Sequence, residues 1–168
     1  VSAQKWAERI KSYANDHIET LQNKISNSTN KKKNARRQKR INRYNNTLSE
    51  ISDLENSTQM YNVVGNSDLN GAGSSGGQTL FNFKENTVDI HLTKDATLAD
   101  AAHEFKHGYQ FDKGKIDLSS TGGGLAHDKQ DEYAGYDRGG LFGTSLYGRG
   151  NLPEGQRSLR NGPTSVSP

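Results

Sequence analysis

The glycines of this 168-residue chain are confined to one part of it. All 18 lie at or after position 65, and the first 64 residues contain none. Charge changes at the same place: residues 1–64 carry 12 Lys and Arg against 6 Asp and Glu, whereas residues 65–168 carry 10 against 13. The chain therefore divides into a basic region, 1–64, and a glycine-rich region, 65–148, with different physical character. A tail, 149–168, holds all three prolines and few apolar residues, which is typical of extended chain.

Composition narrows the classes of protein to consider. Hydrophobic residues make up 30% of the chain, which predicts a small core with loosely packed parts. The chain has no cysteine, which excludes disulfides, thiolate zinc sites, iron–sulfur clusters and a cysteine nucleophile. No apolar run approaches the roughly 18 residues that a membrane-spanning helix needs. No charged start followed by an apolar stretch marks a conventional signal peptide.

Two amphipathic patterns fill the basic region. Apolar and ring-bearing residues recur at steps of three and four, first between positions 6 and 25 and again between 41 and 54, which places them on one face of each predicted helix. Turn-forming residues at 26–30 separate the two patterns. The region 1–64 is therefore predicted to be an antiparallel helical hairpin, which needs the rest of the chain to cover its apolar face. The recurring residues are Trp6, Ile10, Tyr13, His17, Leu21 and Ile25, then Ile41, Tyr44, Leu48, Ile51 and Leu54.

The second predicted helix begins with a dense basic run. Between positions 31 and 43, eight residues are Lys or Arg and none is acidic. One interpretation is a patch that binds nucleic acid or an anionic surface. The other is a solvated helix face near the tip of a hairpin, since the run lacks the aromatic or glycine pattern of a nucleic-acid-binding module. The solvated face is the favoured interpretation, but positive charge at the start of a helix opposes the helix dipole, which keeps the functional interpretation open.

The glycine-rich region begins with a predicted loop and continues with strand patterns. Residues 79–83 are short and aromatic, and 87–92 alternate apolar and polar side chains as a half-buried strand does. With a turn at 84–86 they form a predicted antiparallel hairpin, whose strand 87–92 is expected at a sheet edge where an extended peptide can pair. Thr97 followed by Asp100 fits a capping box and predicts a helix to about residue 109 or 111. The predicted fold class is α+β.

An HExxH pattern lies on that predicted helix. His103 and His107 are one turn apart on the same face, so their imidazoles can reach one Zn²⁺ at roughly 2.0–2.1 Å each. Glu104 lies beside them, close enough to take a proton from a water molecule that the metal activates and to return it to a leaving amine. The pattern, on a capped helix after a strand hairpin, therefore predicts one zinc ion per chain and a catalytic base at Glu104.

A catalytic zinc needs a third protein ligand. Metzincins have Gly where Gln110 stands and His where Lys113 stands, so the chain is not one of them. The favoured third ligand is Glu132, because a second helix around 131–134 could cross the first and present one carboxylate to the metal. The alternatives are Asp112, His127 and Asp131.

Other residues near the predicted site have candidate supporting roles. Asp131 and Asp137 are candidates to orient a histidine ligand through its second ring nitrogen. The oxyanion of the transition state needs a hydrogen-bond donor besides the metal. The candidates for that donor are His127, Tyr133, Tyr136 and Arg138.

The HExxH pattern followed by a distant Glu resembles the gluzincin-type metallopeptidases. More narrowly, residues from about 57 to 143 resemble the zincin-like metallopeptidase toxin domains at the C-termini of Rhs-type polymorphic toxins. In thermolysin-like gluzincins an Asp four residues after the ligand Glu supports a His ligand, whereas here Tyr136 holds that position and Asp137 follows it. The resembling pieces are 57–61, the glycine-rich segment leading to Phe81, 87–91, 102–110 and 131–138, about half of the chain.

This resemblance implies a zincin-like fold, in which a small antiparallel sheet, the HExxH helix and a following Glu-bearing helix come after the helical hairpin. It implies zinc held by His103, His107 and Glu132, with Glu104 as the base. It also implies a secreted or delivered effector that cleaves a protein in a target cell, and a cognate immunity protein in the producing cell.

Two other functions remain open from the sequence. One is a module that binds nucleic acid or an anionic surface through residues 31–43, with the histidines incidental. The other keeps the zinc but hydrolyses an amide of a cell-wall peptide.

Overall fold

The computed structural model describes residues 3–65, 76–116 and 129–143. These contain four helices and a small sheet of three strands, so the fold class is α+β, as predicted. In chain order the elements are α1 (Ala3–Ser26), α2 (Lys31–Glu55), β1 (Met60–Val64), β2 (Gly77–Asn82), β3 (Thr87–Leu92), α3 (Leu98–Asp112) and α4 (Lys129–Gly139).

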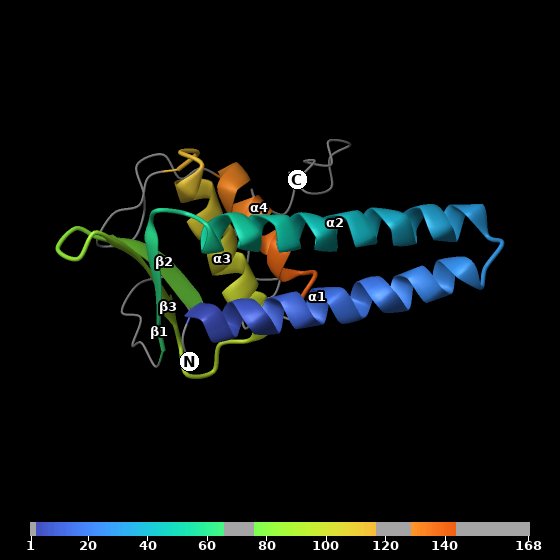
Figure 1. The fold of residues 1–168 in the computed structure, drawn as a ribbon, viewed down its shortest axis with the longest axis horizontal. Coiled ribbons are helices and arrows are strands. Elements are labelled where there is room, and N and C mark those ends of the chain that lie inside the picture. The colour runs from blue at the N-terminus through green and yellow to red at the C-terminus, as the bar shows by residue number, and fades with distance from the viewer. Residues whose placement is uncertain (1–2, 66–75, 117–128, 144–168) are drawn as a thin grey trace.

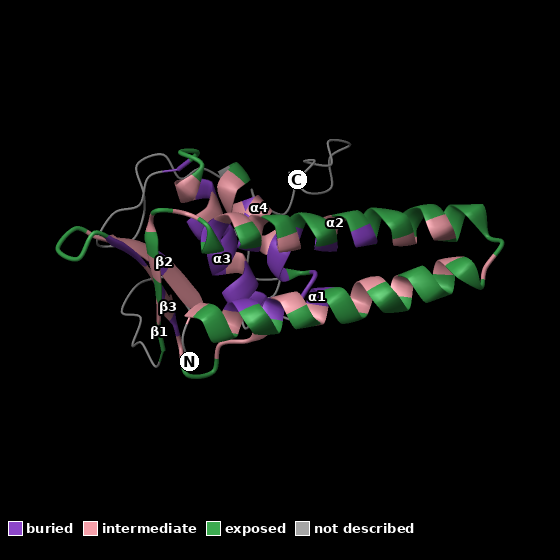
Figure 2. Ribbon diagram, in the orientation of Figure 1, coloured by how far each residue is buried: buried purple, intermediate pink, exposed green. Residues whose placement is uncertain are grey.

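Helices α1 and α2 form the predicted hairpin. Asn30 caps α2, because its side chain accepts a hydrogen bond from the backbone N–H of Lys33 at 2.9 Å. The near halves of both helices contribute buried residues, whereas residues 15–40 contain none. The far half of the hairpin therefore extends beyond the body of the molecule (Figure 1), and Figure 2 shows it mostly exposed. The buried residues of the hairpin are Ala7, Ile10, Ala14, Ile41, Tyr44, Thr47, Ile51 and Leu54.

The sheet has the strand order β1-β3-β2. Strands β2 and β3 form the predicted antiparallel hairpin, and in its turn the side chain of Asn82 accepts hydrogen bonds from the backbone N–H groups of Lys84 and Glu85. The prediction of a purely antiparallel sheet is wrong, because β1 pairs parallel with β3, Met60 opposite Thr87. Strand β3 is consequently central and not the expected edge strand. In the described part of the chain, β1 and β2 form the edges.

Strand β1 lies in the segment 1–64 that the sequence predicts to be wholly a helical hairpin. Its five residues alternate in burial, with Tyr61 and Val63 half-buried and Met60 64% exposed. So short an alternation does not distinguish a strand from the frayed end of a helix. Parallel pairing also joins segments that are distant in the chain, which no local pattern reveals.

Helix α3 begins at the predicted capping box. The Thr97 hydroxyl accepts a hydrogen bond from the backbone N–H of Asp100 at 3.2 Å, and the Asp100 carboxylate accepts one from the Thr97 backbone N–H at 2.9 Å. Helix α3 lies between the sheet and the hairpin (Figure 1). One hydrophobic core therefore includes residues of the hairpin, of β3, of α3 and of the segment after α4. Its buried members are Ala7, Ile10, Ala14, Tyr44, Ile51, Leu54, Ile90, Leu92, Ala99, Ala101, Ala102, Phe105, Leu141 and Phe142.

Parts of the predictions fall on residues that the structure does not describe. His127, residues 144–148 of the predicted catalytic region and the tail 149–168 all lie outside the described residues. None of the described helices is long and apolar enough to cross a membrane.

Candidate metal centre

Three side chains of α3 and α4 converge on one point. The Nε2 atoms of His103 and His107 lie 2.9 Å apart, and oxygens of Glu132 lie 3.4 and 3.3 Å from these two nitrogens. In a tetrahedral site with ligands at about 2.0–2.1 Å from zinc, neighbouring donor atoms are about 3.3 Å apart. Two imidazoles and one carboxylate also form a ligand set that catalytic zinc sites use. The three residues are thus a group that could bind a metal ion.

Two glycines let α4 approach α3 closely. A Cβ at Gly135 would lie 2.9–3.1 Å from atoms of the His103 ring, and a Cβ at Gly139 would lie 2.8 Å from the carbonyl oxygen of Ala99. Any larger residue at these positions would therefore force the two helices or the imidazole to shift. Glu132 lies one turn before Gly135 on α4, so this close approach also sets the distance between its carboxylate and the histidines.

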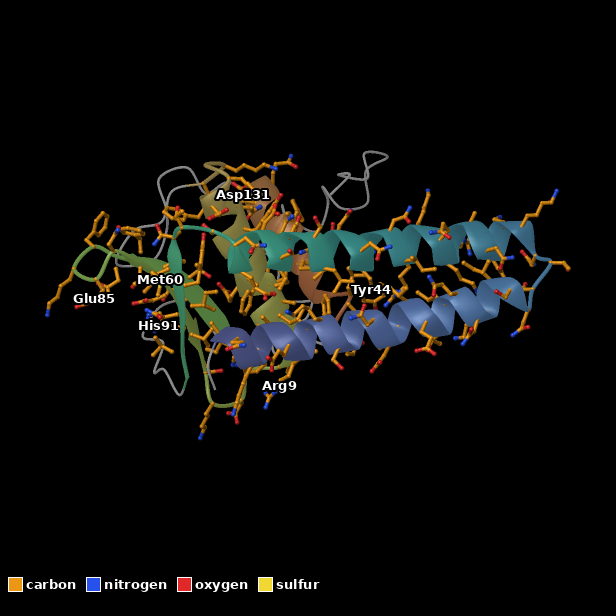
Figure 3. All side chains as sticks on the ribbon, in the orientation of Figure 1. Arg9, Tyr44, Met60, Glu85, His91 and Asp131 are labelled. Carbon is orange, nitrogen blue, oxygen red and sulfur yellow. The ribbon has the colours of Figure 1, made fainter. Side chains whose placement is uncertain are left out.

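A chain of hydrogen bonds fixes the orientation of His107. Its Nδ1 lies 2.8 Å from Oε1 of Gln110, and Nε2 of Gln110 donates to a carboxylate oxygen of Asp131 at 3.2 Å. Asp131, labelled in Figure 3, lies on α4. An ionised carboxylate only accepts hydrogen bonds, so Asp131 turns the amide nitrogen of Gln110 toward itself and the amide oxygen toward the imidazole. Gln110 therefore accepts the Nδ1–H of His107 and leaves Nε2 facing the other donor atoms.

Glu104 is buried between α3 and β2. The hydroxyl of Thr79 in β2 donates to Oε2 of Glu104 at 2.6 Å, and Oε1 lies 3.9 Å from Nε2 of His103. One carboxylate oxygen is thus held by the sheet, while the other lies beside the candidate metal ligands. A Cβ at Gly77 would lie 2.7 Å from Cγ of Glu104, so the glycine makes room for this side chain.

The charges of the cluster stabilise one another. Burial raises the pKa of Glu132, but hydrogen bonds and charges of the two histidines outweigh burial and hold that pKa well below its usual range. Burial lowers the pKa of His107, but hydrogen bonding to Glu132 and the charges of Glu104 and Glu132 raise it to about 9. At neutral pH the imidazole of His107 is therefore protonated, and a metal ion that bound to its Nε2 would displace that proton.

Asp112, an alternative third ligand, lies elsewhere. It is the last residue of α3, where the hydroxyl of Tyr61 donates to its Oδ1 at 2.8 Å and the hydroxyl of Ser57 donates to the same oxygen. These bonds connect β1 and the segment before it to α3. Asp112 thus anchors the edge of the sheet, and the structure does not bring it to the histidines.

Of the remaining candidate residues, the structure places one at the cluster. The ring of Tyr136 packs edge-on against the imidazole of His103, with centroids 4.5 Å apart, so Tyr136 lies at the cluster. Tyr133 is buried, and its hydroxyl has no hydrogen-bond partner in the described part of the chain. The backbone carbonyl of Asp137 accepts a hydrogen bond from an arginine of α2. His127 lies outside the described residues.

Arg138 belongs to a buried ion cluster that ties α2 to both metal-centre helices. Glu50 of α2 accepts a hydrogen bond from Lys106 of α3 at 2.6 Å and another from Arg138 of α4. Burial and the neighbouring charge of Arg138 lower the pKa of Lys106, against the opposing effect of Glu50. Removing one member would leave buried charge without its partner, which is strongly destabilising. The sequence proposes Arg138 as an oxyanion donor, but the structure gives it this connecting role.

Sequence reasoning missed two residues that support the cluster. Gln110 follows His107 by three positions, so helical spacing carried a usable signal. Thr79 contacts Glu104 across β2 and α3, and no local pattern indicates that contact.

Comparison of the chain with protein-family models, curated proteins and solved structures found no match.

Proposed function

We propose that this protein is a zinc-dependent metallopeptidase. The observation that carries the proposal is the position of Glu104: Thr79 holds its carboxylate beside the donor atoms of three residues suited to zinc. A structural zinc site has four protein ligands. Here the described residues supply three, with a buried carboxylate next to them, and this arrangement supports a hydrolytic site.

The roles of the side chains follow from these positions. A zinc ion held by His103, His107 and Glu132 would lower the pKa of a water molecule and polarise the carbonyl of the substrate. Glu104 accepts the proton that the attacking water gives up as the new C–O bond forms. The same carboxyl group donates that proton to the amine nitrogen as the C–N bond breaks. One water is consumed and Glu104 returns to its ionised form, while Thr79 keeps the carboxylate oriented through both transfers.

The position of β2 favours an extended peptide as the substrate. Within the described residues, β2 pairs with β3 on one side only. It also carries Thr79, which contacts the proposed base. A peptide that added itself to the open edge of β2 would run past Glu104 with its main-chain carbonyls close by. Strand β2 thus takes the edge position expected for β3, which is the central strand.

The resemblance to Rhs-type toxin domains extends the proposal to a biological role. We propose that the chain is an effector delivered into a target cell, where it cleaves a protein, and that an immunity protein protects the producing cell. Two of the pieces that carry the resemblance, 102–110 and 131–138, also supply the metal donors and the proposed base. Expression inside a bacterial cell should arrest growth, and Glu104→Gln should abolish the arrest.

Metal content and peptide cleavage test the enzymatic proposal. Purified protein should contain one zinc per chain by mass spectrometry and should cleave an unfolded protein. Glu104→Gln should keep the zinc and slow cleavage roughly 10²- to 10⁴-fold, because it removes the base but no ligand. Glu132→Ala should lose most of the zinc. Glu85→Gln, at an exposed turn, is the matched control and should change neither result.

Two results would contradict this function. One is protein without zinc even after zinc is added back, and the other is cleavage that persists in Glu104→Gln. If zinc binds but only cell-wall peptide fragments are hydrolysed, the amidase alternative replaces the protein substrate.

A further inference from the structure

The far half of the helical hairpin, residues 15–40, contributes no residue to the metal centre, and we call it the arm. Only its base touches the core, where Ile18 and Leu21 pack against it half-buried. The arm contains no buried residue, and Figure 1 shows it projecting away from the body. Polar contacts close its tip: the side chain of Asn34 donates to the carbonyl of Ser28 at 2.7 Å, and Arg37 donates to the carbonyl of Lys24 at 3.0 Å. The arm is therefore an ordered extension whose outer part, including the basic residues 31–40, supplies no buried residue to the core.

The α2 side of the arm is densely basic and lacks compensating charge. Its cations belong to the run 31–43, which holds eight Lys and Arg and no acid. The buried cations of the body behave differently, since Lys106 and Arg138 both pair with Glu50. Like charges this close repel one another, and a bound polyanion would relieve that repulsion. Five exposed cations form no ion pair with a carboxylate of the described residues: Lys31, Lys32, Lys33, Arg36 and Lys39.

Three of these cations form a row along one face of α2. Lys32, Arg36 and Lys39 follow one another at four and three positions along one face of α2, which corresponds to steps of about 6 and 4.5 Å along the helix axis. Successive phosphates of one DNA strand are about 3.4 Å apart along the duplex axis, which is less than either step, so the side chains must span the difference. Figure 3 shows long side chains projecting outward along α2, so their flexible ends can adjust to a row of phosphates.

The arm also lacks the features that other partners require. The exposed large hydrophobic residues of the described chain are Met60, Val64 and Phe83, all in or beside the sheet. The arm therefore offers no apolar face for insertion into a bilayer. It offers no aromatic or apolar anchor of the kind that dominates binding between proteins, and no exposed aromatic ring to stack on single-stranded bases. The interactions left to the arm are contacts of lysine and arginine with phosphates. Such contacts bind duplexes without discriminating between base sequences.

We propose that the arm binds the phosphate backbone of double-stranded nucleic acid through the exposed cations of α2. This site is separate from the metal centre and does not depend on the peptidase proposal. Binding is expected to be independent of base sequence and to weaken steeply as salt concentration rises.

Fluorescence anisotropy with a labelled 20-base-pair DNA of arbitrary sequence tests this proposal. If five cations each neutralise one phosphate, the logarithm of the binding constant falls with the logarithm of salt concentration with a slope of about −4.5. Affinity should then drop about 500-fold between 50 and 200 mM salt. A variant with all five cations changed to Gln should lose at least about a hundredfold in affinity at 50 mM salt and most of the slope.

A control variant distinguishes the effect of the arm cations on DNA binding from the effect of net charge. It changes five exposed cations of the body to Gln and so removes the same total charge: Lys5, Arg9, Lys84, Lys94 and Lys115. This control should keep most of the DNA affinity. Melting temperature and zinc content of the arm variant should match those of the unchanged protein, because the arm holds no buried residue. If the fivefold variant does not fold, paired changes at Lys32 and Lys33 or at Arg36 and Lys39 should each give part of the loss.

Several outcomes would overturn the proposal. They are the absence of DNA binding at 50 mM salt, equal loss of affinity in the arm variant and the control, and tighter binding to phosphatidylserine vesicles or polyglutamate than to DNA. The last outcome would assign the arm to an anionic membrane or to an acidic protein.

Discussion

Replacing Gln110 with alanine should weaken zinc binding without unfolding the protein. The Gln110 amide oxygen lies 2.8 Å from Nδ1 of His107, and its nitrogen lies 3.2 Å from the Asp131 carboxylate. Gln110 and His107 are both 4% exposed, so water cannot easily replace the lost partner. A buried group left without its hydrogen bond costs about 1–3 kcal/mol. Part of that cost falls equally on the zinc-free and zinc-loaded forms and cancels in the affinity.

The part of the cost that does not cancel comes from the lost orientation of the His107 imidazole. Groups that orient a histidine ligand typically contribute 10- to 100-fold to metal affinity, or about 1.4–2.7 kcal/mol. We expect this loss in Gln110→Ala, measured by competition with a chromophoric chelator at pH 7.5. Gln38→Ala, which removes an exposed glutamine of α2, is the matched control and should leave the affinity unchanged.

A second pair of variants tests the direction of the hydrogen bonds. Gln110→Glu still accepts the Nδ1–H of His107 but places a carboxylate against Asp131, and adding Asp131→Asn should remove that repulsion and restore affinity. Zinc binding by Gln110→Ala within about twofold of the unchanged protein, at the same melting temperature, would contradict this orienting role. Gln110 would then only pack against the histidine.

Three further predictions concern packing, the base and pH. Gly135→Ala adds a Cβ 2.9–3.1 Å from atoms of the His103 imidazole, so zinc affinity should fall at least about tenfold in chelator competition. Unchanged affinity with a higher melting temperature would contradict the close approach of α4 to α3. Thr79→Val removes the hydroxyl that donates to Glu104 at 2.6 Å, so peptide turnover should fall roughly 10- to 100-fold while zinc content stays at one per chain; unchanged turnover would show that the hydroxyl does not position the base. Burial and a hydrogen bond to a carboxylate raise the pKa of Tyr61, so folding keeps this phenol protonated, and its stabilising effect is present below the usual pKa of about 10 and lost as the pH rises above it. Chemical denaturation between pH 9 and 11.5 should show a smaller loss of stability in Tyr61→Phe than in the unchanged protein, and identical pH dependences would contradict this.

The sequence by itself determined the local parts of this protein. His103 and His107 share a face because helical periodicity places residues four apart one above the other wherever the helix lies. The capping box of Thr97 and Asp100 joins residues three apart, and the turn at 26–30 separates two amphipathic patterns. Each of these features depends on contacts within a few residues of the chain, so a pattern of residue types is sufficient to predict it.

The tertiary structure decided which distant residues meet. The sequence favoured Glu132 as the third ligand but left Asp112, His127 and Asp131 open. Among the described residues, which do not include His127, the close crossing of α4 over α3 placed only Glu132 beside both histidines. The same packing brought Thr79 to the proposed base and Gln110 to Asp131. It also placed β1 parallel to β3 and so moved the sheet edge to β2. These pairings depend on how whole helices and strands pack around a shared core. The packing energy is distributed over many residues that are distant in the chain, so no local pattern of residue types predicts it.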